Sequence, residues 1–168
     1  MRVTRNKKEE FMSILRHLEA KDYHPIIQVV DEWWGGRPMA SRLPKLFFEH
    51  FQPTSFVMEQ VGAIQGFLIG FRSQTIPTQG YIHFVGADPH HRGQGIGRRL
   101  YQHFFEVASN LGCTEVLSIT SPVNKGSIAF HTRMGFEILP GDAETDGIAV
   151  TTNYGGVGVD HVLFRRRL

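Results

Sequence analysis

Two long segments of the chain repeat apolar residues at the spacing of an amphipathic helix. The first begins after Asp22, which can cap a helix, and ends before the glycine pair at 35 and 36. Its apolar positions are Ile26, Ile27, Val29, Val30 and Trp33. The second begins at Ile96 and ends at Gly112, and its apolar positions are Ile96, Leu100, Phe104, Val107, Ala108 and Leu111. Both segments are therefore predicted to be helices, with shorter helices over 40–51 and 125–134.

Short apolar runs between turn residues predict the strands. They lie at 55–58, 64–71, 81–87, 116–119, 136–139 and 159–165. Val61 and Gly62 suit a hairpin turn between the first two runs, and Gly66 and Gly70 could mark bulges. Residues 11–18 fit either a helix begun by a capping box or an imperfect strand, and the local pattern leaves both open.

The order of these elements predicts a mixed α and β fold on a mainly antiparallel sheet, with strand–helix units after residue 80. A chain of 168 residues without repeats or an interdomain linker suits one domain, which we place at 11–168. Residues 1–10 are rich in charge and are predicted to be a flexible lead-in. The glycine-rich stretch 141–158 precedes the last predicted strand, and residues 153–158 within it could be a substrate loop or a flexible hairpin tip.

Composition narrows the class of protein. Hydrophobic residues make up 41% and charged residues 20% of the sequence, as in a folded globular domain. No apolar run approaches the roughly 20 residues that cross a bilayer, and the charged N-terminus does not resemble a secretory signal, so we expect a cytoplasmic protein without a membrane span. The single cysteine excludes an intrachain disulfide and a cysteine-based zinc site, and no metal is expected. The net charge of +2 gives little support to nucleic-acid binding.

The strongest chemical signal is a glycine turn between a predicted strand and the best predicted helix. The sequence Arg92-Gly93-Gln94-Gly95-Ile96-Gly97 follows the strand and Pro89. The first N–H groups of a helix lack partners and carry partial positive charge, and glycines let a phosphate approach the backbone closely. Arg92 and Arg98 could add charge-assisted contacts. The alternative is that the glycines merely form a tight turn. The spacing fits neither a mononucleotide loop nor a dinucleotide fingerprint.

This turn resembles the acyl-CoA-binding motif of the GNAT superfamily of N-acetyltransferases. That motif is Gln or Arg, two variable residues, Gly, one variable residue, and then Gly or Ala. Further similarity lies in Asn124, Ala129, Phe130, Met134-Gly135-Phe136, Leu15-Arg16, Asp22 and Glu32-Trp33-Trp34. The resemblance runs in order over residues 11–168, is strongest at 80–137, and favours a strand at 11–18.

The resemblance implies an α+β GNAT-like fold, with a mainly antiparallel twisted sheet of about seven strands flanked by about four helices. The sheet would splay between its fourth and fifth strands, here 81–87 and 115–120. Acetyl-CoA is the implied co-substrate, with its pantetheine on the fourth strand and its pyrophosphate on the amides of the turn. The implied CoA-binding residues are Val85, Gly86, Ala87, Arg92, Gly93, Gln94, Gly95, Ile96, Gly97, Arg98, Asn124 and Phe130. The implied reaction is acetyl transfer to a primary amine, and a homodimer is plausible by family analogy.

Catalytic candidates are fewer. His83 lies on the predicted fourth strand, and an unperturbed histidine titrates near pH 6.5, so His83 could act as the base or simply face a cavity. His131 stands where the family usually has a tyrosine, and it could protonate the leaving thiolate or only pack; Ser127 or Tyr154 could replace it. Trp33, Trp34 and Tyr154 are candidate acceptor contacts, although the tryptophans also suit core packing. The missing tyrosine motivates an alternative function, a non-catalytic acyl-CoA-binding or sensing domain. Nucleic-acid binding through the arginines is a third hypothesis.

Overall fold

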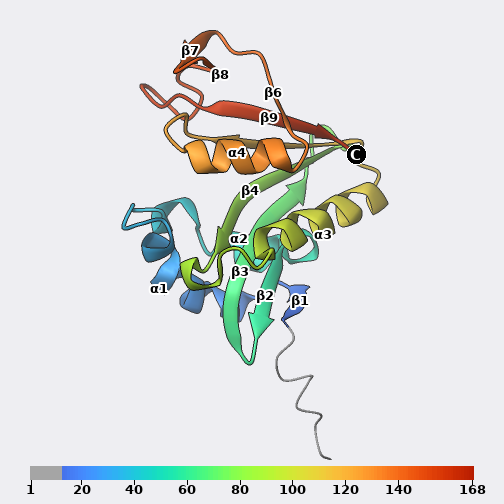
Figure 1. Ribbon diagram of the computed structural model, residues 1–168. Helices are drawn as coiled ribbons and strands as arrows, with labels where there is room; N and C mark the ends of the chain where they lie inside the picture. The colour runs from blue at the N-terminus through green and yellow to red at the C-terminus, as the bar shows by residue number, and fades with distance from the viewer. Residues whose placement is uncertain (1–12) are drawn as a thin grey trace, which may run out of the picture. The chain divides into compact units, whose positions relative to one another are not determined.

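A computed structural model describes residues 13–168, so the predicted lead-in at 1–10 lies outside the described residues (Figure 1). The strands are β1 Ile14–His17, β2 Phe56–Gln60, β3 Ala63–Arg72, β4 Gln79–Ala87, β5 Glu115–Thr120, β6 Glu137–Ile138, β7 Ala143–Thr145, β8 Ile148–Val150 and β9 Val162–Arg167. The α-helices are α1 Tyr23–Trp33, α2 Leu46–His50, α3 Ile96–Asn110 and α4 Lys125–Arg133. Seven strands form one sheet in the order β1-β2-β3-β4-β5-β9-β6, and β7 and β8 form a hairpin. The predicted mixed fold is confirmed.

The chain divides into two compact units, which we describe separately. The described part of the first unit comprises 13–71 and 84–104, and the second unit comprises 72–83 and 105–168. The division falls within β4 and within α3, so each unit contains part of both elements.

In the first unit, β2 pairs antiparallel with β1 on one side and with β3 on the other. Val61 and Gly62 both have positive φ, 50° and 79°, as the predicted hairpin turn requires. The register shifts between Met58 and Glu59, opposite the segment that contains Gly66, so a bulge does lie next to this glycine. A Cβ on Gly70 would lie 2.3 Å from the ring of Phe104. Close packing against α3 therefore explains Gly70.

Helix α1 buries Ile26, Val30 and Trp33 against a core that includes Phe67 of β3. Asp22 stands at its N-cap position, but its side chain makes no capping hydrogen bond, contrary to the prediction. The Asp22 carboxylate instead accepts two hydrogen bonds from Arg16 of β1, both at 2.8 Å, and one from the Glu19 amide at 2.8 Å. The Asp22 carboxylate is thus occupied by the Arg16 guanidinium and the Glu19 amide, and it does not cap α1.

The predicted helix at 40–51 is wrong in its first half. Residues Ala40–Arg42 form a 3-10 turn, and only Leu46–His50 are α-helical. Pro44 lies between them, and the residue before a proline is disfavoured in the α conformation, so one continuous helix cannot form there.

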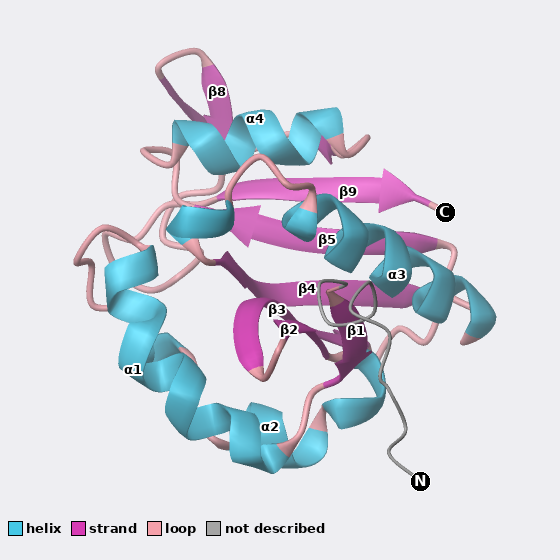
Figure 2. Cartoon of the chain, turned by 60° about the horizontal axis from the view of Figure 1, so that its bottom comes forward, coloured by secondary structure: helices cyan, strands magenta, loops and turns pink. Residues whose placement is uncertain are grey.

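In the second unit, β9 pairs antiparallel with both β5 and β6, and α4 lies beside β9 (Figure 2). β4 pairs with β5 in parallel, from Gln79 opposite Glu115 to Ile82 opposite Ser118. The pairing ends there, although β4 continues to Ala87 and β5 to Thr120. The end of the pairing agrees with the predicted splay between these strands.

Two further features of the second unit lie near its surface loops. The hairpin of β7 and β8 turns at Asp146 and Gly147, with φ of 51° and 76°, and the sequence prediction missed it. Cys113, just before β5, is 5% exposed, and burial raises the pKa of its thiol.

Candidate functional site

The glycine turn has the backbone that its sequence requires. Gly93 and Gly95 lie in the left-handed region, with φ of 79° and 76°, and a Cβ on either would meet no atom within 4 Å. Glycine is therefore required at both positions by the backbone conformation and not by close packing. The space around both Cα atoms is open. Ile96 is 5% exposed and begins α3, a helix of 15 residues whose first-turn amides adjoin the turn. The predicted anion-binding turn thus has open space above it and a helix N-terminus beside it.

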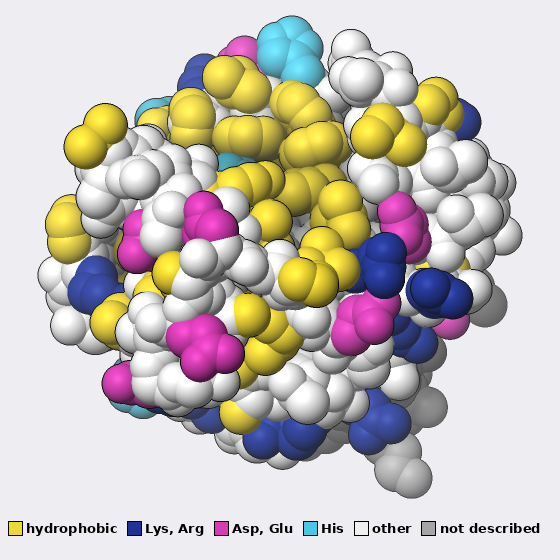
Figure 3. All heavy atoms as spheres, turned by 90° about the horizontal axis from the view of Figure 1, so that it is seen from above, with side chains coloured by type: hydrophobic (Ala, Val, Ile, Leu, Met, Phe, Trp, Pro, Cys, Tyr) yellow, Lys and Arg dark blue, Asp and Glu magenta, His cyan; other side chains and the backbone are white. Residues whose placement is uncertain are grey.

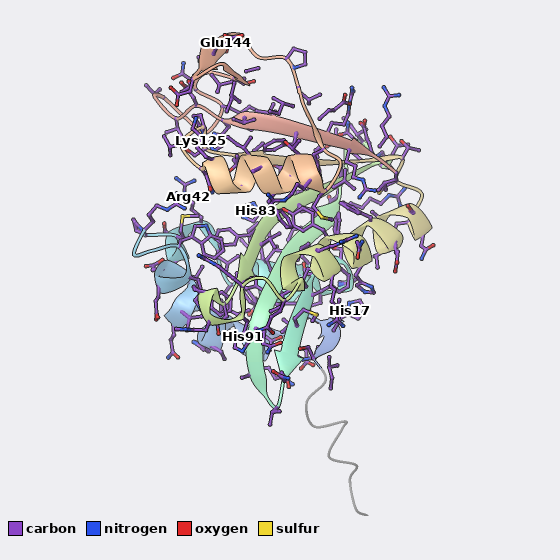
Figure 4. All side chains as sticks on the ribbon, in the orientation of Figure 1. His17, Arg42, His83, His91, Lys125 and Glu144 are labelled. Carbon is purple, nitrogen blue, oxygen red and sulfur yellow. The ribbon has the colours of Figure 1, made fainter. Side chains whose placement is uncertain are left out.

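Asp88 fixes the entry to this turn. Its carboxylate accepts hydrogen bonds from the His90 amide at 2.9 Å and from His91 Nδ1 at 3.0 Å, and its own amide donates to the Gln65 carbonyl (Figure 4). Burial opposes ionisation of Asp88, but the two histidine hydrogen bonds outweigh it and hold its pKa below the ordinary value. The aspartate therefore acts as a charged cap for the short 3-10 helix at Pro89–His91.

The residues around the turn have distinct surroundings. Arg92 is exposed, and its guanidinium donates to the Trp33 carbonyl at 3.3 Å. Gln94 and Arg98 are also exposed, and Gly97 is half-buried. Three of the predicted CoA-binding residues, Arg92, Gln94 and Arg98, thus present their side chains to solvent around the start of α3.

On β4, Gly86 faces the aromatic core. A Cβ there would lie 2.7 Å from the ring of Phe67 and 2.8 Å from the indole of Trp34. Side chains alternate along a strand, so the half-exposed Val85 and Ala87 point to the opposite face from Gly86. Both predicted pantetheine-binding residues therefore lie on the more open face of this strand.

Trp33 and Trp34 pack within the first unit. Trp33 is 7% exposed with its ring 6.2 Å from that of Phe67, and Trp34 lies 4.9 Å from Phe84. These contacts favour core packing for both tryptophans, the second of the two sequence interpretations.

The remaining predicted residues belong to the second unit. His83 is half-buried on β4 (Figure 4). Asn124 caps α4, since its side-chain oxygen accepts from the Ser127 amide at 3.2 Å. Phe130 is half-exposed on the same helix.

His131 is packed as an aromatic core residue. It is 4% exposed, its ring stacks on Phe164 at 4.4 Å and 7°, and Phe136 lies 5.2 Å away. Nδ1 lies 2.8 Å from the Ser127 carbonyl, an acceptor only, so Nδ1 carries the proton. Burial lowers the pKa of His131, and the hydrogen bond to Ser127 only partly opposes this effect. The imidazole is therefore neutral and donates a hydrogen bond to the backbone of α4. This favours a packing role for His131 over a role as the acid that protonates the thiolate.

The loop that carries Tyr154 is held by several hydrogen bonds. Asp142 accepts from the Thr152 amide and hydroxyl at 2.8 and 2.9 Å, and Asp160 accepts from the Asn153 amide at 2.9 Å. Asn153 in turn accepts from Gly158 at 2.7 Å. This network joins the loop to its flanking residues, and the two interpretations of the loop both stay predictions. Acidic residues flanking a glycine-rich stretch were the sequence signal for this network.

Tyr154 is 48% exposed and lies beside His161, with ring centroids 5.9 Å apart. A Cβ on Gly155 would lie 2.5 Å from the His161 ring, so the glycine permits this approach. Tyr81 of β4 also belongs to this group, because burial, and then the nearby Tyr154, raise its pKa to about 12. Sequence reasoning missed Tyr81, which stands two residues before His83.

Charge is mixed on the face drawn in Figure 3, where Lys and Arg side chains on one side lie next to Asp and Glu, and hydrophobic side chains gather in the upper half. Among residues 13–168, no helix is long and apolar enough to span a bilayer. Within the same residues, no group of three His, Cys, Asp or Glu side chains is arranged to hold a metal ion.

A strand, a left-handed glycine turn and a helix N-terminus, set in a mixed sheet with a parallel β4–β5 pair, define a class of proteins that bind phosphate-bearing ligands at this junction. The chain belongs to the acetyltransferase (GNAT) family, whose model matches residues 13–136.

Two curated relatives match parts of the chain. N-alpha-acetyltransferase 30 of Schizosaccharomyces pombe is 34% identical over 58 residues, which span 34% of this chain and 39% of that protein. L-2,4-diaminobutyric acid acetyltransferase of Nocardia farcinica is 32% identical over 84 residues, which span 50% of this chain and 44% of that protein. The chain thus spans less than half the length of these relatives.

Solved structures share the fold. Ard1 from Thermoplasma volcanium is 18% identical with a TM-score of 0.74, and the match covers 93% of this chain and 97% of that one. The structure of yncA from Salmonella typhimurium with its cofactor acetyl-CoA is 18% identical with a TM-score of 0.69, covering 94% of both chains. At this identity the likeness extends to the fold alone.

Proposed function

We propose that this protein is an acetyl-CoA-dependent N-acetyltransferase that transfers the acetyl group directly to a primary amine of a small molecule or protein. The observation that carries the proposal is the glycine turn, with Gly93 and Gly95 at positive φ beside the N-terminus of α3. Family membership and the names of the curated relatives support it. The residues that would hold acetyl-CoA are Val85, Gly86 and Ala87 of β4, Arg92 to Arg98 of the turn, and Asn124 and Phe130 of the second unit.

The proposed chemistry needs a neutral amine. His83, directly or through water, accepts the proton of the ammonium, and the nitrogen then attacks the thioester carbonyl carbon. The new C–N bond forms, the nitrogen releases its second proton to solvent, the C–S bond breaks, and CoA leaves as a thiolate that takes up a proton. Because His131 is neutral and packed, we assign the proton for sulfur to solvent or to a tyrosine instead of His131.

Tyr154 is the acceptor contact that the geometry supports best. Its loop is fixed by Asp142, Asn153 and Asp160, so the half-exposed phenol is held in place beside His161. A preorganised aromatic side chain binds ligand at a low cost in conformational entropy. In this proposal Trp33 and Trp34 support the fold and do not contact the acceptor. A homodimer and a cytoplasmic location stay predictions.

The test is release of CoA thiol from acetyl-CoA in the presence of a panel of primary amines. We expect turnover with at least one amine, a large loss of kcat in His83→Ala, and a raised acceptor KM in Tyr154→Ala. His131→Phe should retain most of kcat. CoA binding without turnover on any amine, unchanged by these variants, would favour the alternative function, an acyl-CoA-sensing domain.

A further inference from the structure

A groove of about 590 Å³ lies within the first unit, between one face of α1 and the hairpin of β2 and β3. Its volume falls in the range of sites for small organic ligands, about 300–1,000 Å³. Of the residues predicted from the sequence to bind CoA or the acceptor, the groove contains Trp33 alone. The proposed acetyl transfer therefore leaves this groove without a role.

Part of the lining of the groove is apolar. It comprises Ile26 and Val29 of α1 and Ile64 of β3. Ile26 is fully buried, whereas Val29 and Ile64 are half-exposed and can contact a ligand. These side chains suit an aliphatic or aromatic body.

The charged part of the lining carries an excess of negative charge. It comprises three carboxylates, those of Asp22, Glu59 and Asp88, and the cations of Arg16 and Lys21. The Arg16 guanidinium is engaged by Asp22 at 2.8 Å and by Glu59 at 2.7 Å. Lys21 is engaged by Glu19, at 2.7 Å. Both cations therefore already have carboxylate partners.

Glu59 and Asp88 retain capacity for a ligand. Their side chains are 27% and 19% exposed, and a carboxylate has about four acceptor positions, more than their present contacts use. A cation between apolar side chains and partly buried carboxylates is stabilised more than in water, because screening is weaker there.

We propose that this groove binds an amine cation with an apolar body, its nitrogen among the carboxylates of Glu59 and Asp88 and its body along Val29 and Ile64. The site is built entirely from the first unit, whereas Tyr154 and His83 belong to the second. Binding there does not depend on the proposed acetyl transfer.

The probe is N,N-dimethylhexylamine, a cation at neutral pH that cannot form a stable amide. Calorimetric titration of the full chain should give saturable binding. Val29→Phe, which fills the groove, should weaken binding about tenfold or more, while Gln28→Phe, on the exposed side of the same helix, should not. If Val29→Phe fails to fold, Ala63→Phe fills the groove from the exposed start of β3.

Three results would overturn the proposal. The first is the absence of saturable binding. The second is equal binding of 1-hexanol, which would make the groove apolar and indifferent to charge. The third is loss of binding in Tyr154→Ala with retention in Val29→Phe, which would place the amine at the acceptor loop. These binding measurements do not depend on acetyl transfer. The amine-binding proposal and the proposed function are therefore tested separately.

Discussion

Replacement of Gly95 by alanine tests the backbone conformation of the turn without changing any side-chain contact. Gly95 has φ of 76°, and the added Cβ would meet no atom within 4 Å. The cost is therefore conformational, about 1–2 kcal/mol for an L-residue in the left-handed region. The unfolded chain also loses entropy on replacement of glycine, which offsets about 0.4–1 kcal/mol of that cost. We expect Gly95→Ala to lower the free energy of unfolding by about 1 kcal/mol, measured by urea denaturation.

Ligand binding should change by more than stability alone explains. If the alanine relaxes the turn in the free protein, acetyl-CoA must restore the conformation, at a cost of about 1–2 kcal/mol or about five- to thirtyfold in Kd. Calorimetric titration with CoA measures this loss. Gly147 offers a matched control, because it also has φ of 76° and a Cβ added there would meet no atom within 4 Å, but it turns the β7–β8 hairpin.

Gly147→Ala should cost the same stability and leave CoA affinity unchanged. The reasoning is refuted if Gly95→Ala binds CoA as tightly as the unmodified chain. It is equally refuted if Gly147→Ala weakens binding to the same extent.

Three further predictions concern packing and charge. Gly70→Ala places a Cβ 2.3 Å from the buried ring of Phe104 and should lower the free energy of unfolding by about 1–3 kcal/mol, measured by urea denaturation. Adding Phe104→Leu should restore part of this loss. A Gly70→Ala variant as stable as the unmodified chain would contradict the packing account. Arg16→Met leaves the Asp22 carboxylate, 3% exposed, without its cation and should lower the free energy of unfolding by about 3 kcal/mol. The loss should be smaller when Asp22→Asn is added. Additive effects in the double variant would argue against the ion pair. Because the pKa of His131 is lowered on folding, its contribution to stability is present above the ordinary histidine pKa of about 6.5 and is lost as the pH falls. His131→Phe should therefore flatten the decline of unfolding free energy between neutral and acidic pH, and an unchanged profile would show that His131 does not cause it.

Local sequence signals predicted the turns and the helix ends well. Gly112 and Gly135 were expected to end helices, and both have φ of 84° just after α3 and α4. The dipeptide at 146–147 carries an equally clear hairpin signal, with both residues at positive φ, but the glycine-rich composition around it obscured the two short strands.

Side-chain roles were harder to predict because they depend on distant partners. The Asp22 carboxylate pairs with Arg16, six residues earlier on β1, and Arg16 pairs in turn with Glu59 of β2, which is far away in sequence. His131 likewise stands where the family resemblance suggested an acid, and its burial against the rings of Phe164 and Phe136 indicates a packing role. Periodicity locates a residue on an element, but its protonation depends on what the fold brings against it.

The buried thiol of Cys113 has a practical consequence for chemical labelling. It is the only cysteine in the sequence, is 5% exposed, and has its pKa raised by burial, so little reactive thiolate forms near neutral pH. Thiol reagents should therefore register released CoA with little background from the native chain. A cysteine introduced at Val157, which is 99% exposed, should then accept a maleimide dye at a single position and make the Tyr154 loop visible to spectroscopy.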